Sequence, residues 1–299
     1  MQVIEYNGYN TAKLDVEICC ALGFFDGVHV GHRHLIRECI STAKKEKLVP
    51  AVFTFPAETM DLKGGKGRIY STEDKIEIFR ECGVELLVLC NFSSVRELTP
   101  EQFVSDVLCG DLNCRVALTG EGFRFGKGAA GTPEILSQLL TENGAKAITV
   151  EDVKIDGVTV SSTEIRRALY DGQPEYAARL LGEPYFIRGK VRHGRGVGRV
   201  YGFPTVNTEL RDKTALKVGV YKSCLTIDGK VYTGLTNIGT CPTFDRREIH
   251  AETMILNFSG DLYGENLKIN LLKFIRFERK FDTPEDLRAQ IDKDILELE

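Results

Sequence analysis

The chain has no tryptophan and only five histidines, and none of its apolar runs approaches the roughly 20 residues that a membrane-spanning helix needs. Its N-terminal stretch also lacks the basic, apolar and small-residue order of a secretory signal. The nine cysteines include no Cys-x-x-Cys pair and show no metal-ligand spacing. We therefore expect no membrane partner, and thiols that are mostly small core residues in a reducing cytoplasm.

Excess positive charge is missing as well, because 39 Lys and Arg stand against 43 Asp and Glu, a formal net charge of −4. Binding nucleic acid over a broad face needs Lys and Arg concentrated on one surface, so we expect no nucleic-acid partner. A small phosphate-bearing ligand is still compatible, since it needs only a few cations and backbone N–H groups. The sequence does not indicate an oligomeric state.

The 299 residues suffice for two domains, and we predict that residues 1–183 form the first of them. Apolar strand patterns alternate there with helical ones, which predicts an α/β, Rossmann-like domain with a parallel sheet and helices on both faces. Ligands of such sheets collect at the carboxyl ends of the strands. The predicted strands are 16–23, 48–55, 84–91 and 114–120, and the clearest helix is 31–45.

After Pro184 the sequence pattern changes to short β-type segments separated by turn signals such as Asp228-Gly229. This spacing suggests a small barrel or sandwich, and we predict a small β-barrel over residues 184–299. The last segment starts at Thr283-Pro284 and has apolar residues at helical spacing. It predicts a C-terminal helix that closes the barrel.

The stretch GFFDGVHVGHRHL, residues 23–35, directly follows the first predicted strand and opens a helix. Its glycines let a ligand approach the backbone, and a helix N-terminus suits phosphate. Two imidazoles there could hydrogen-bond an α-phosphate as its charge grows during nucleotidyl transfer. The alternative is a helix cap with incidental histidines. The candidate residues are Gly23, Phe25, Asp26, Gly27 and Gly31 for nucleotide binding and His29 and His32 for catalysis.

The string Gly-x-Phe-Asp-Gly-x-His-x-Gly-His resembles the signature of the nucleotidyltransferase superfamily, whose members attack a nucleotide α-phosphate and release pyrophosphate. The second element that this resemblance implies is present downstream as SSTEIRRAL. Its hydroxyls, backbone N–H groups and guanidinium suit the β- and γ-phosphates, and the alternative is a simple capping box from Ser161 to Glu164. The nucleotide-binding candidates here are Ser161, Ser162, Thr163 and Arg166.

A glycine-rich loop, TGEGFRFGKGAAGT (119–132), lies between these two elements. Its alternating aromatics suggest a platform for a flat ligand, whereas the alternative is an ordinary loop that buries two phenylalanines. The loop is similar to the Phe-x-Phe-Gly loop of the bacterial FAD synthetase module, which adenylylates FMN, although Gly122 stands where that family usually has Asp or Asn. The resemblance implies flavin binding by Phe123, Arg124, Phe125 and Gly126.

The second domain carries GKVRHGRGVGRVYGFPTVNTEL, residues 189–210. Glycines interleaved with arginines can surround phosphates with N–H groups and positive charge. Thr205 and Asn207 lie two residues apart in an extended segment, so both point to one side and offer the hard oxygen donors that Mg²⁺ accepts. The alternative is a glycine-rich hairpin with a Thr-Asn pair at its edge. The candidate phosphate ligands are Gly194, Gly196, Gly198, Arg199 and Pro204.

The string Gly-Arg-x-x-Gly-Phe-Pro-Thr-x-Asn resembles the riboflavin kinase domain. That resemblance implies that Glu252 removes the proton from the riboflavin 5′-hydroxyl and that Arg276 lies near the flavin; the alternative for Glu252 is a solvated strand carboxylate. Nearly the whole chain is thus similar to the bifunctional bacterial riboflavin kinase/FAD synthetase family. The implied molecules are ATP, Mg²⁺, riboflavin, FMN, FAD, ADP and pyrophosphate.

Two other functions stay open from the sequence. The first is a riboflavin kinase whose N-terminal module is weak or serves another acceptor. The second is a non-catalytic flavin or nucleotide sensor, against which a base and metal donors argue, because a sensor has no use for them.

Overall fold

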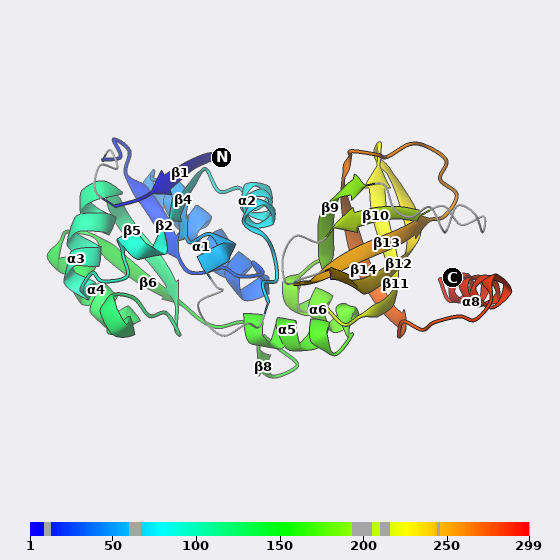
Figure 1. The fold of residues 1–299 in the computed structure, drawn as a ribbon. Coiled ribbons are helices and arrows are strands. Elements are labelled where there is room, and N and C mark those ends of the chain that lie inside the picture. Colours follow the sequence, from blue (N-terminus) through cyan, green and yellow to red (C-terminus); the bar gives the residue numbers. More distant parts are fainter. Residues whose placement is uncertain (9–12, 60–66, 193–204, 210–215, 244–245, 299) are drawn as a thin grey trace. The chain divides into compact units, whose positions relative to one another are not determined.

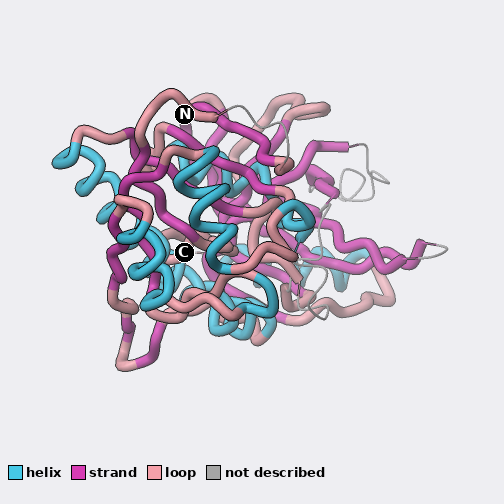
Figure 2. The backbone as a smooth tube through the Cα atoms, turned by 90° about the vertical axis from the view of Figure 1, so that its left-hand side faces the viewer, coloured by secondary structure: helices cyan, strands magenta, loops and turns pink. Residues whose placement is uncertain are grey.

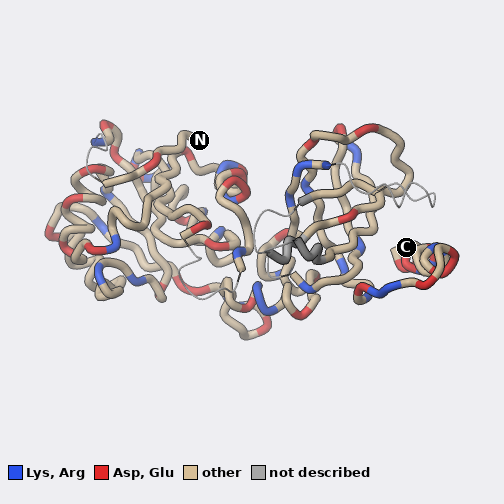
Figure 3. Tube along the Cα trace, in the orientation of Figure 1, with Lys and Arg blue, Asp and Glu red and all other residues tan. Residues whose placement is uncertain are grey.

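The computed structural model describes residues 1–8, 13–59, 67–192, 205–209, 216–243 and 246–298 (Figure 1). By their internal contacts the residues form two compact units, Met1–Ser162 and Thr163–Glu299. Lys and Arg are interspersed with Asp and Glu along both (Figure 3). Among the residues described, no helix is both long and apolar enough to cross a bilayer.

The first unit is built on a six-stranded sheet with the order β1-β4-β3-β2-β5-β6, in which every neighbouring pair is parallel. The predicted parallel α/β sheet is therefore confirmed. Strand β2 lies at the centre and its five residues are all buried, as expected for a strand covered on both faces. The strands are β1 (Gln2–Tyr6), β2 (Ile18–Leu22), β3 (Val49–Thr54), β4 (Leu86–Cys90), β5 (Cys114–Gly120) and β6 (Lys146–Val150).

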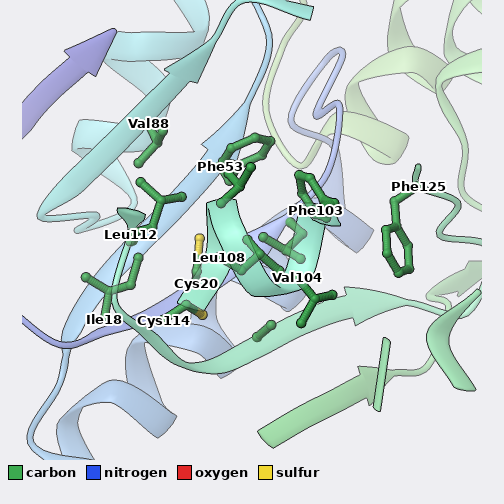
Figure 4. Close-up of a cluster of buried hydrophobic side chains, with 14 of the residues drawn as sticks. Ile18, Cys20, Phe53, Val88, Phe103, Val104, Leu108, Leu112, Cys114 and Phe125 are labelled. Carbon is green, nitrogen blue, oxygen red and sulfur yellow. The ribbon is translucent and has the colours of Figure 1, made fainter. Parts of the chain in front are cut away.

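Helices cover both faces of this sheet. Figure 2 shows the helices of the chain in cyan and its strands in magenta. Cys39 of α1 (Val30–Glu46) lies 3.8 Å from Cys19 of β2, sulfur to sulfur, and so marks one face. The next β2 residue, Cys20, points to the other face, where it packs with the π-helix η3 (Phe103–Asp111) and with α4 (Pro133–Glu142). Figure 4 shows this second core cluster, in which Cys20 and Cys114 lie among Ile18, Leu108 and Leu112.

Helix starts in this unit follow the side-chain caps that the sequence provides. Ser71 forms a reciprocal capping box with Asp74 at the start of α2 (Thr72–Glu81), and Thr99 does the same with Gln102 at α3 (Pro100–Gln102). Thr132 accepts from the backbone of Ile135 at α4. The smaller elements are the 3-10 turns η2 (Phe92–Ser94) and η4 (Lys127–Ala129) and the hairpin of β7 (Lys154–Ile155) and β8 (Val158–Thr159).

The second unit contains a closed barrel of six strands with the order β10-β13-β12-β11-β14-β9, all neighbours antiparallel. The prediction of a barrel is confirmed, and Asp228 and Gly229 make the tight turn with φ of 50° and 77°. The unit's elements are α5 (Ser162–Tyr170, its first residue in the first unit), α6 (Pro174–Leu181), β9 (Phe186–Arg192), β10 (Thr205–Glu209), β11 (Gly219–Ile227), β12 (Lys230–Thr243), β13 (Arg246–Ile255), β14 (Asn266–Arg276) and α8 (Pro284–Leu296).

The two faces of the barrel wall differ in chemistry. One face carries fully buried hydroxyls, in which Thr236 lies 2.7 Å from Ser223 and 2.9 Å from Thr253, oxygen to oxygen. Residues one position along the strands point the opposite way and pack against α8. This small cluster joins Val220, Leu235 and Met254 with Ile291, Ile295 and Leu298.

Candidate active sites

The turn between β2 and α1 is strained and buried. Phe25 and Val28 have φ of 53° and 40°, in the left-handed region that non-glycine residues rarely occupy. Phe25 is 1% exposed and Asp26 is 3% exposed, and the Asp26 carboxylate accepts a hydrogen bond from the backbone of Ile69 at 3.3 Å. Such strain persists only where surrounding structure holds it, and it concentrates at functional sites.

The two predicted catalytic histidines lie against each other at the start of α1. Their rings stack with centroids 3.5 Å apart and an interplanar angle of 18°. His29 is the N-cap, and its Nδ1 accepts from the backbone N–H of His32 at 3.3 Å. A ring nitrogen that accepts carries no proton, so neutral His29 has its proton on Nε2, where it can donate to a ligand. The predicted helix cap and the predicted phosphate site are thus compatible.

Both imidazoles are held in the neutral form. Burial lowers the pKa of His29 to about 4. Burial also lowers the pKa of His32 well below its ordinary value, and the neighbouring His29 and Lys75 add to the effect. The Nδ1 of His32 is buried and has no hydrogen-bond partner among the described residues. An unpartnered polar atom at the strand ends is ready to bind a polar ligand.

The downstream segment SSTEIRRAL contacts the turn between β2 and α1 through Ser162. Ser162 is the first residue of α5, and its hydroxyl donates to the backbone oxygen of Asp26 at 2.6 Å. Two segments that are 136 residues apart in the chain therefore meet at the strand ends. Thr163 and Arg166 follow on α5 in the second unit, and Glu164 pairs with Arg167 at 2.7 Å.

The Phe-x-Phe-Gly loop packs its aromatics together. The rings of Phe123 and Phe125 stack with centroids 5.7 Å apart, and Phe125 is 7% exposed. A side chain at Gly131 would lie 2.4 Å from the Phe125 ring, so only glycine allows this packing. Arg124 donates to the carbonyl of Phe123. The stacked rings agree with the predicted aromatic platform, and the burial of Phe125 agrees with the alternative of a loop that buries its phenylalanines.

Further phenylalanines, which the sequence reasoning missed, join these two rings in a cluster whose contacts are mostly edge-to-face. Phe103 lies 5.5 Å from Phe125 and 5.7 Å from Phe53, ring centre to ring centre, and Phe53 lies 5.7 Å from Phe55. Phe55 in turn touches Phe24, at 5.9 Å, and Phe92, at 5.4 Å. Beside this phenylalanine cluster is a cavity of about 510 Å³ with Pro56, Phe92, Asn91, Glu58 and Arg96 in its lining.

A second missed residue is Lys75 of α2, which is 1% exposed. Its ammonium donates to the backbone oxygens of Phe24 and Phe55, each at 2.9 Å. A signal was available in the sequence, because Lys75 shares the buried helical face of Ile78 and Phe79, three and four residues further on.

In the barrel, the sheet register brings the kinase candidates into one row. Asn207 of β10 lies directly opposite Glu252 of β13, which lies opposite Asn237 of β12. The row continues through Val220 of β11 to Arg276 of β14. Directly opposed residues of antiparallel strands point to the same face. Thr205 joins that face because it lies two residues before Asn207.

The polar groups of this row are only partly satisfied. The side chain of Glu252 is 46% exposed, and its Oε1 lies 3.9 Å from Nε2 of His250. The amide nitrogen of Asn237 donates to Glu278 at 3.3 Å, but its buried Oδ1 has no partner among the described residues. Sequence reasoning missed Asn237, which only the register places beside Glu252. It also missed His250, although the two-residue spacing from Glu252 on β13 was a signal that both side chains share one face.

The donor set of this row fits Mg²⁺. Thr205, Asn207 and Asn237 offer neutral oxygens, which are hard ligands that Mg²⁺ binds together with water and phosphate. The unpartnered oxygen of Asn237 is the structural sign that a donor is free here. Within the described ranges, no group of three or more His, Cys, Asp or Glu could hold a metal ion.

Arg276 is engaged within its own unit. Its Nε and Nη2 both donate to the carboxylate of Asp294 on α8, at 2.8 to 3.0 Å, and its Nη1 donates to the backbone of Phe277. Asp294 is 1% exposed, so this two-point ion pair is the buried anchor of α8. The predicted phosphate ligands Gly194, Gly196, Gly198, Arg199 and Pro204 lie outside the described residues.

Comparisons with known proteins cover both units. A family model for FAD synthetase matches residues 12–164, and one for riboflavin kinase matches residues 181–299. The bifunctional riboflavin kinase/FMN adenylyltransferase of Bacillus subtilis is 38% identical over 92% of this chain and 89% of its own, and that of Escherichia coli K12 is 34% identical over 96% and 94%.

A solved structure described as a macrolide-efflux protein from Streptococcus pneumoniae superposes with a TM-score of 0.87 at 31% identity, over 98% of this chain and 97% of that chain. The two proteins share one fold across both units. With two family models that match in order and full-length relatives above 30% identity, the chain belongs to the bifunctional riboflavin kinase/FMN adenylyltransferase family.

Proposed function

We propose that this chain converts riboflavin to FAD in two ATP-dependent steps, with FMN as the product of the first and the substrate of the second. The kinase step takes place on residues 184–299 and releases ADP, and the adenylyl transfer takes place on residues 1–183 and releases pyrophosphate. The observation that supports the proposal is that one chain holds two different polar arrangements in separate units, the stacked His29–His32 pair and the row from Asn207 to Glu252.

In the adenylyl step, the start of α1 receives the α-phosphate. The N–H groups of the helix and the Nε2–H of His29 donate to its oxygens, and these hydrogen bonds strengthen as charge grows on phosphorus in the transition state. Gly31 lets the backbone come close, because a side chain there would lie 3.2 Å from the His29 ring. Gly23 and Gly27 play the same part earlier in the turn.

The segment at the start of α5 is proposed to bind the pyrophosphate that leaves. Ser162 already braces the turn through Asp26, and we propose that Ser161, Thr163 and Arg166 bind the β- and γ-phosphates as predicted. The leaving group then departs with its charge matched by hydroxyls and a guanidinium. Phe25 and Asp26 hold the turn in its strained form.

The acceptor of the adenylyl group is proposed to lie against the phenylalanine cluster. An isoalloxazine ring is flat and apolar over most of its surface, so the Phe123 and Phe125 platform suits it, with Arg124 and Gly126 at the edge of the loop. The cavity beside Phe92 and Pro56 has room for the rest of a flavin.

In the kinase step, Glu252 accepts the proton of the riboflavin 5′-hydroxyl, and that oxygen attacks the γ-phosphoryl group. Thr205, Asn207 and Asn237 would hold Mg²⁺ on the same face of the barrel. When bound there, the ion supplies neutralisation of the phosphate charge. Arg276 keeps α8 beside this row, where we propose that the flavin binds.

Location is also part of the proposal. The eight described cysteines are all free, and five of them are buried. Free thiols in the core support a reducing compartment, for which we propose the cytoplasm.

The test is a time course of purified protein with riboflavin, ATP and Mg²⁺, separated by chromatography and combined with a pyrophosphate assay. FMN should appear first, followed by FAD with an equal amount of pyrophosphate. FMN without FAD would support the kinase-only alternative, and binding of flavin without either product would support the sensor.

A further inference from the structure

Lys75 is a buried cation that neither step described so far uses. Lysine is almost never fully buried unless its charge is paired, because removing an ammonium from water is costly. Within the described part of the chain, the contacts of the Lys75 Nζ are with uncharged oxygens, namely the Phe24 and Phe55 carbonyls and, at 3.3 Å, the Thr54 hydroxyl. A lysine kept at this cost in a core position points to a role for the charge at that place.

Its three acceptors belong to two segments that the adenylyl site needs. Phe24 lies in the strained turn that leads to the histidine pair. Thr54 ends β3, and Phe55 follows it directly before Pro56 of the cavity lining. Thr54 also donates to the Phe24 carbonyl at 2.8 Å, so both side chains hold the same oxygen. The rings of Phe24 and Phe55 stack above this link, and the ammonium lies 5.1 Å from the centre of the Phe24 ring.

The charge of Lys75 also acts on the histidine pair. A positive charge opposes protonation of His32, and this contributes to the lowered pKa of that imidazole. Asp26 and Glu58 are the acidic groups that act on Lys75, and both raise its pKa. Burial outweighs them and lowers the pKa of Lys75 to about 8, so the lysine is largely charged at neutral pH.

We propose that Lys75 is a positioning residue for adenylyl transfer: its ammonium fastens the turn before His29 and His32 to the end of β3, and so sets the histidine pair against the acceptor platform. The inference rests on the proposed adenylyl site. The lysine touches neither the phosphate nor the flavin in this scheme. It acts through the Phe24 and Phe55 backbones and through its field at His32.

The test compares Lys75→Met with the wild type in the full chain. Methionine is an unbranched side chain that lacks only the terminal atom of lysine in length, and it removes the charge and its three hydrogen bonds. We expect kcat for FAD formation from FMN to fall by about 10- to 100-fold, the range that misplacement of catalytic groups produces. Riboflavin phosphorylation by the same sample should be unchanged. Lys45→Met, an exposed change on α1 with the same loss of charge, should leave both activities unchanged.

A purely structural role would lower the rate equally at every pH, so the pH profile is the deciding readout. Without the Lys75 charge His32 should protonate more readily, and the acid limb of kcat/KM for FMN should move to higher pH. Nuclear magnetic resonance of the five histidines should show the same upward change in the pKa of His32. A folded Lys75→Met with a wild-type rate, or with a lower rate but an unmoved profile, overturns the proposal.

If Lys75→Met does not fold, Thr54→Val decides. Valine has the shape of threonine but cannot donate to the Phe24 carbonyl. A fall in kcat of several-fold at an unchanged melting temperature and unchanged KM for ATP supports the link, and wild-type kinetics contradict it. Failure of the wild type itself to form FAD would contradict the proposed function instead, so the two failures are distinguishable.

Discussion

At the scale of single residues, the histidine pair links the adenylyl site to pH. A group whose pKa is lower in the folded state than in the unfolded chain stabilises the fold above its unfolded pKa and loses that contribution as the pH falls. For His29 this window runs from 6.5 down to about 4. A pKa difference of this size corresponds to roughly 3 kcal/mol. His32 shifts in the same direction and adds to the loss.

We therefore expect the melting temperature of the first unit to fall steeply between pH 6.5 and pH 4. In His29→Asn the N-cap is kept, because asparagine caps helices well, but the titrating group is gone. The variant should show a shallower decline over that range when followed by calorimetry. An identical pH dependence in both proteins would show that His29 is not the group responsible.

For the kinase reaction, we predict the effect of a substitution at the proposed base, Glu252. Replacing it by glutamine removes the base but keeps the shape, so FMN formation should fall by about 10² to 10⁴, the usual contribution of general base catalysis. FAD formation from supplied FMN should be unaffected. Glu265→Gln, an exposed carboxylate in the same unit, is the matched control. If phosphorylation of riboflavin stays at the wild-type rate in Glu252→Gln, the assigned role is wrong.

At the scale of elements, α8 depends on one buried carboxylate. Its apolar contacts with the barrel are few, and Asp294 contributes a two-point ion pair to Arg276. Leu287, Ile291 and Ile295, the apolar residues at helical spacing, are only half-buried, whereas Asp294 is buried. The residue that anchors α8 is thus the Asp294 carboxylate, although a hydrophobic–polar pattern predicts that a charged residue is exposed to solvent.

Asp294→Asn should loosen α8. Removing one charge of a buried pair costs about 3 kcal/mol or more, since the arginine is left without its partner. Hydrogen exchange of the α8 amides should therefore accelerate, and the KM for riboflavin should rise, while FAD formation from FMN is preserved. Asp292→Asn, on the exposed side of the same helix, should change none of these. Equal exchange rates in the two variants would assign the anchor to the apolar contacts instead.

At the scale of the whole molecule, each unit has its own sheet and its own core, and the two proposed reactions share only FMN as a free intermediate. His29→Ala should lose FAD formation by about 10² to 10³, the effect of removing one transition-state donor. Glu252→Gln should lack FMN formation. A mixture of the two variants should make FAD from riboflavin, because FMN from one chain can reach the other.

The measurement is FAD by chromatography after each variant, alone and mixed, receives riboflavin and ATP. Neither variant alone should produce more than a trace. No FAD in the mixture, with each variant still active in its remaining step, would mean that FMN does not leave the chain that makes it.

The sequence by itself determined the parallel sheet, the barrel, the helix after the first predicted strand, the start of the C-terminal helix and the family. These depend on local information, since periodicity, caps and turn pairs act within a few residues, and the signature strings are contiguous. The same holds for His29 and His32, which are three residues apart on one helix start. The π-helix η3 was not foreseen, because its apolar residues fit an ordinary helix equally well.

Only the tertiary structure decided what meets across the chain. The strand register aligned Asn207 with Glu252 and Asn237, the fold joined Ser162 to Asp26, and it buried Lys75 under Phe24 and Phe55. A shift of one residue in that register would turn every side chain of the row to the other face, and no local pattern specifies which strands pair. The sequence shows which residue types are present, but only long-range packing decides which of them become neighbours in the proposed sites.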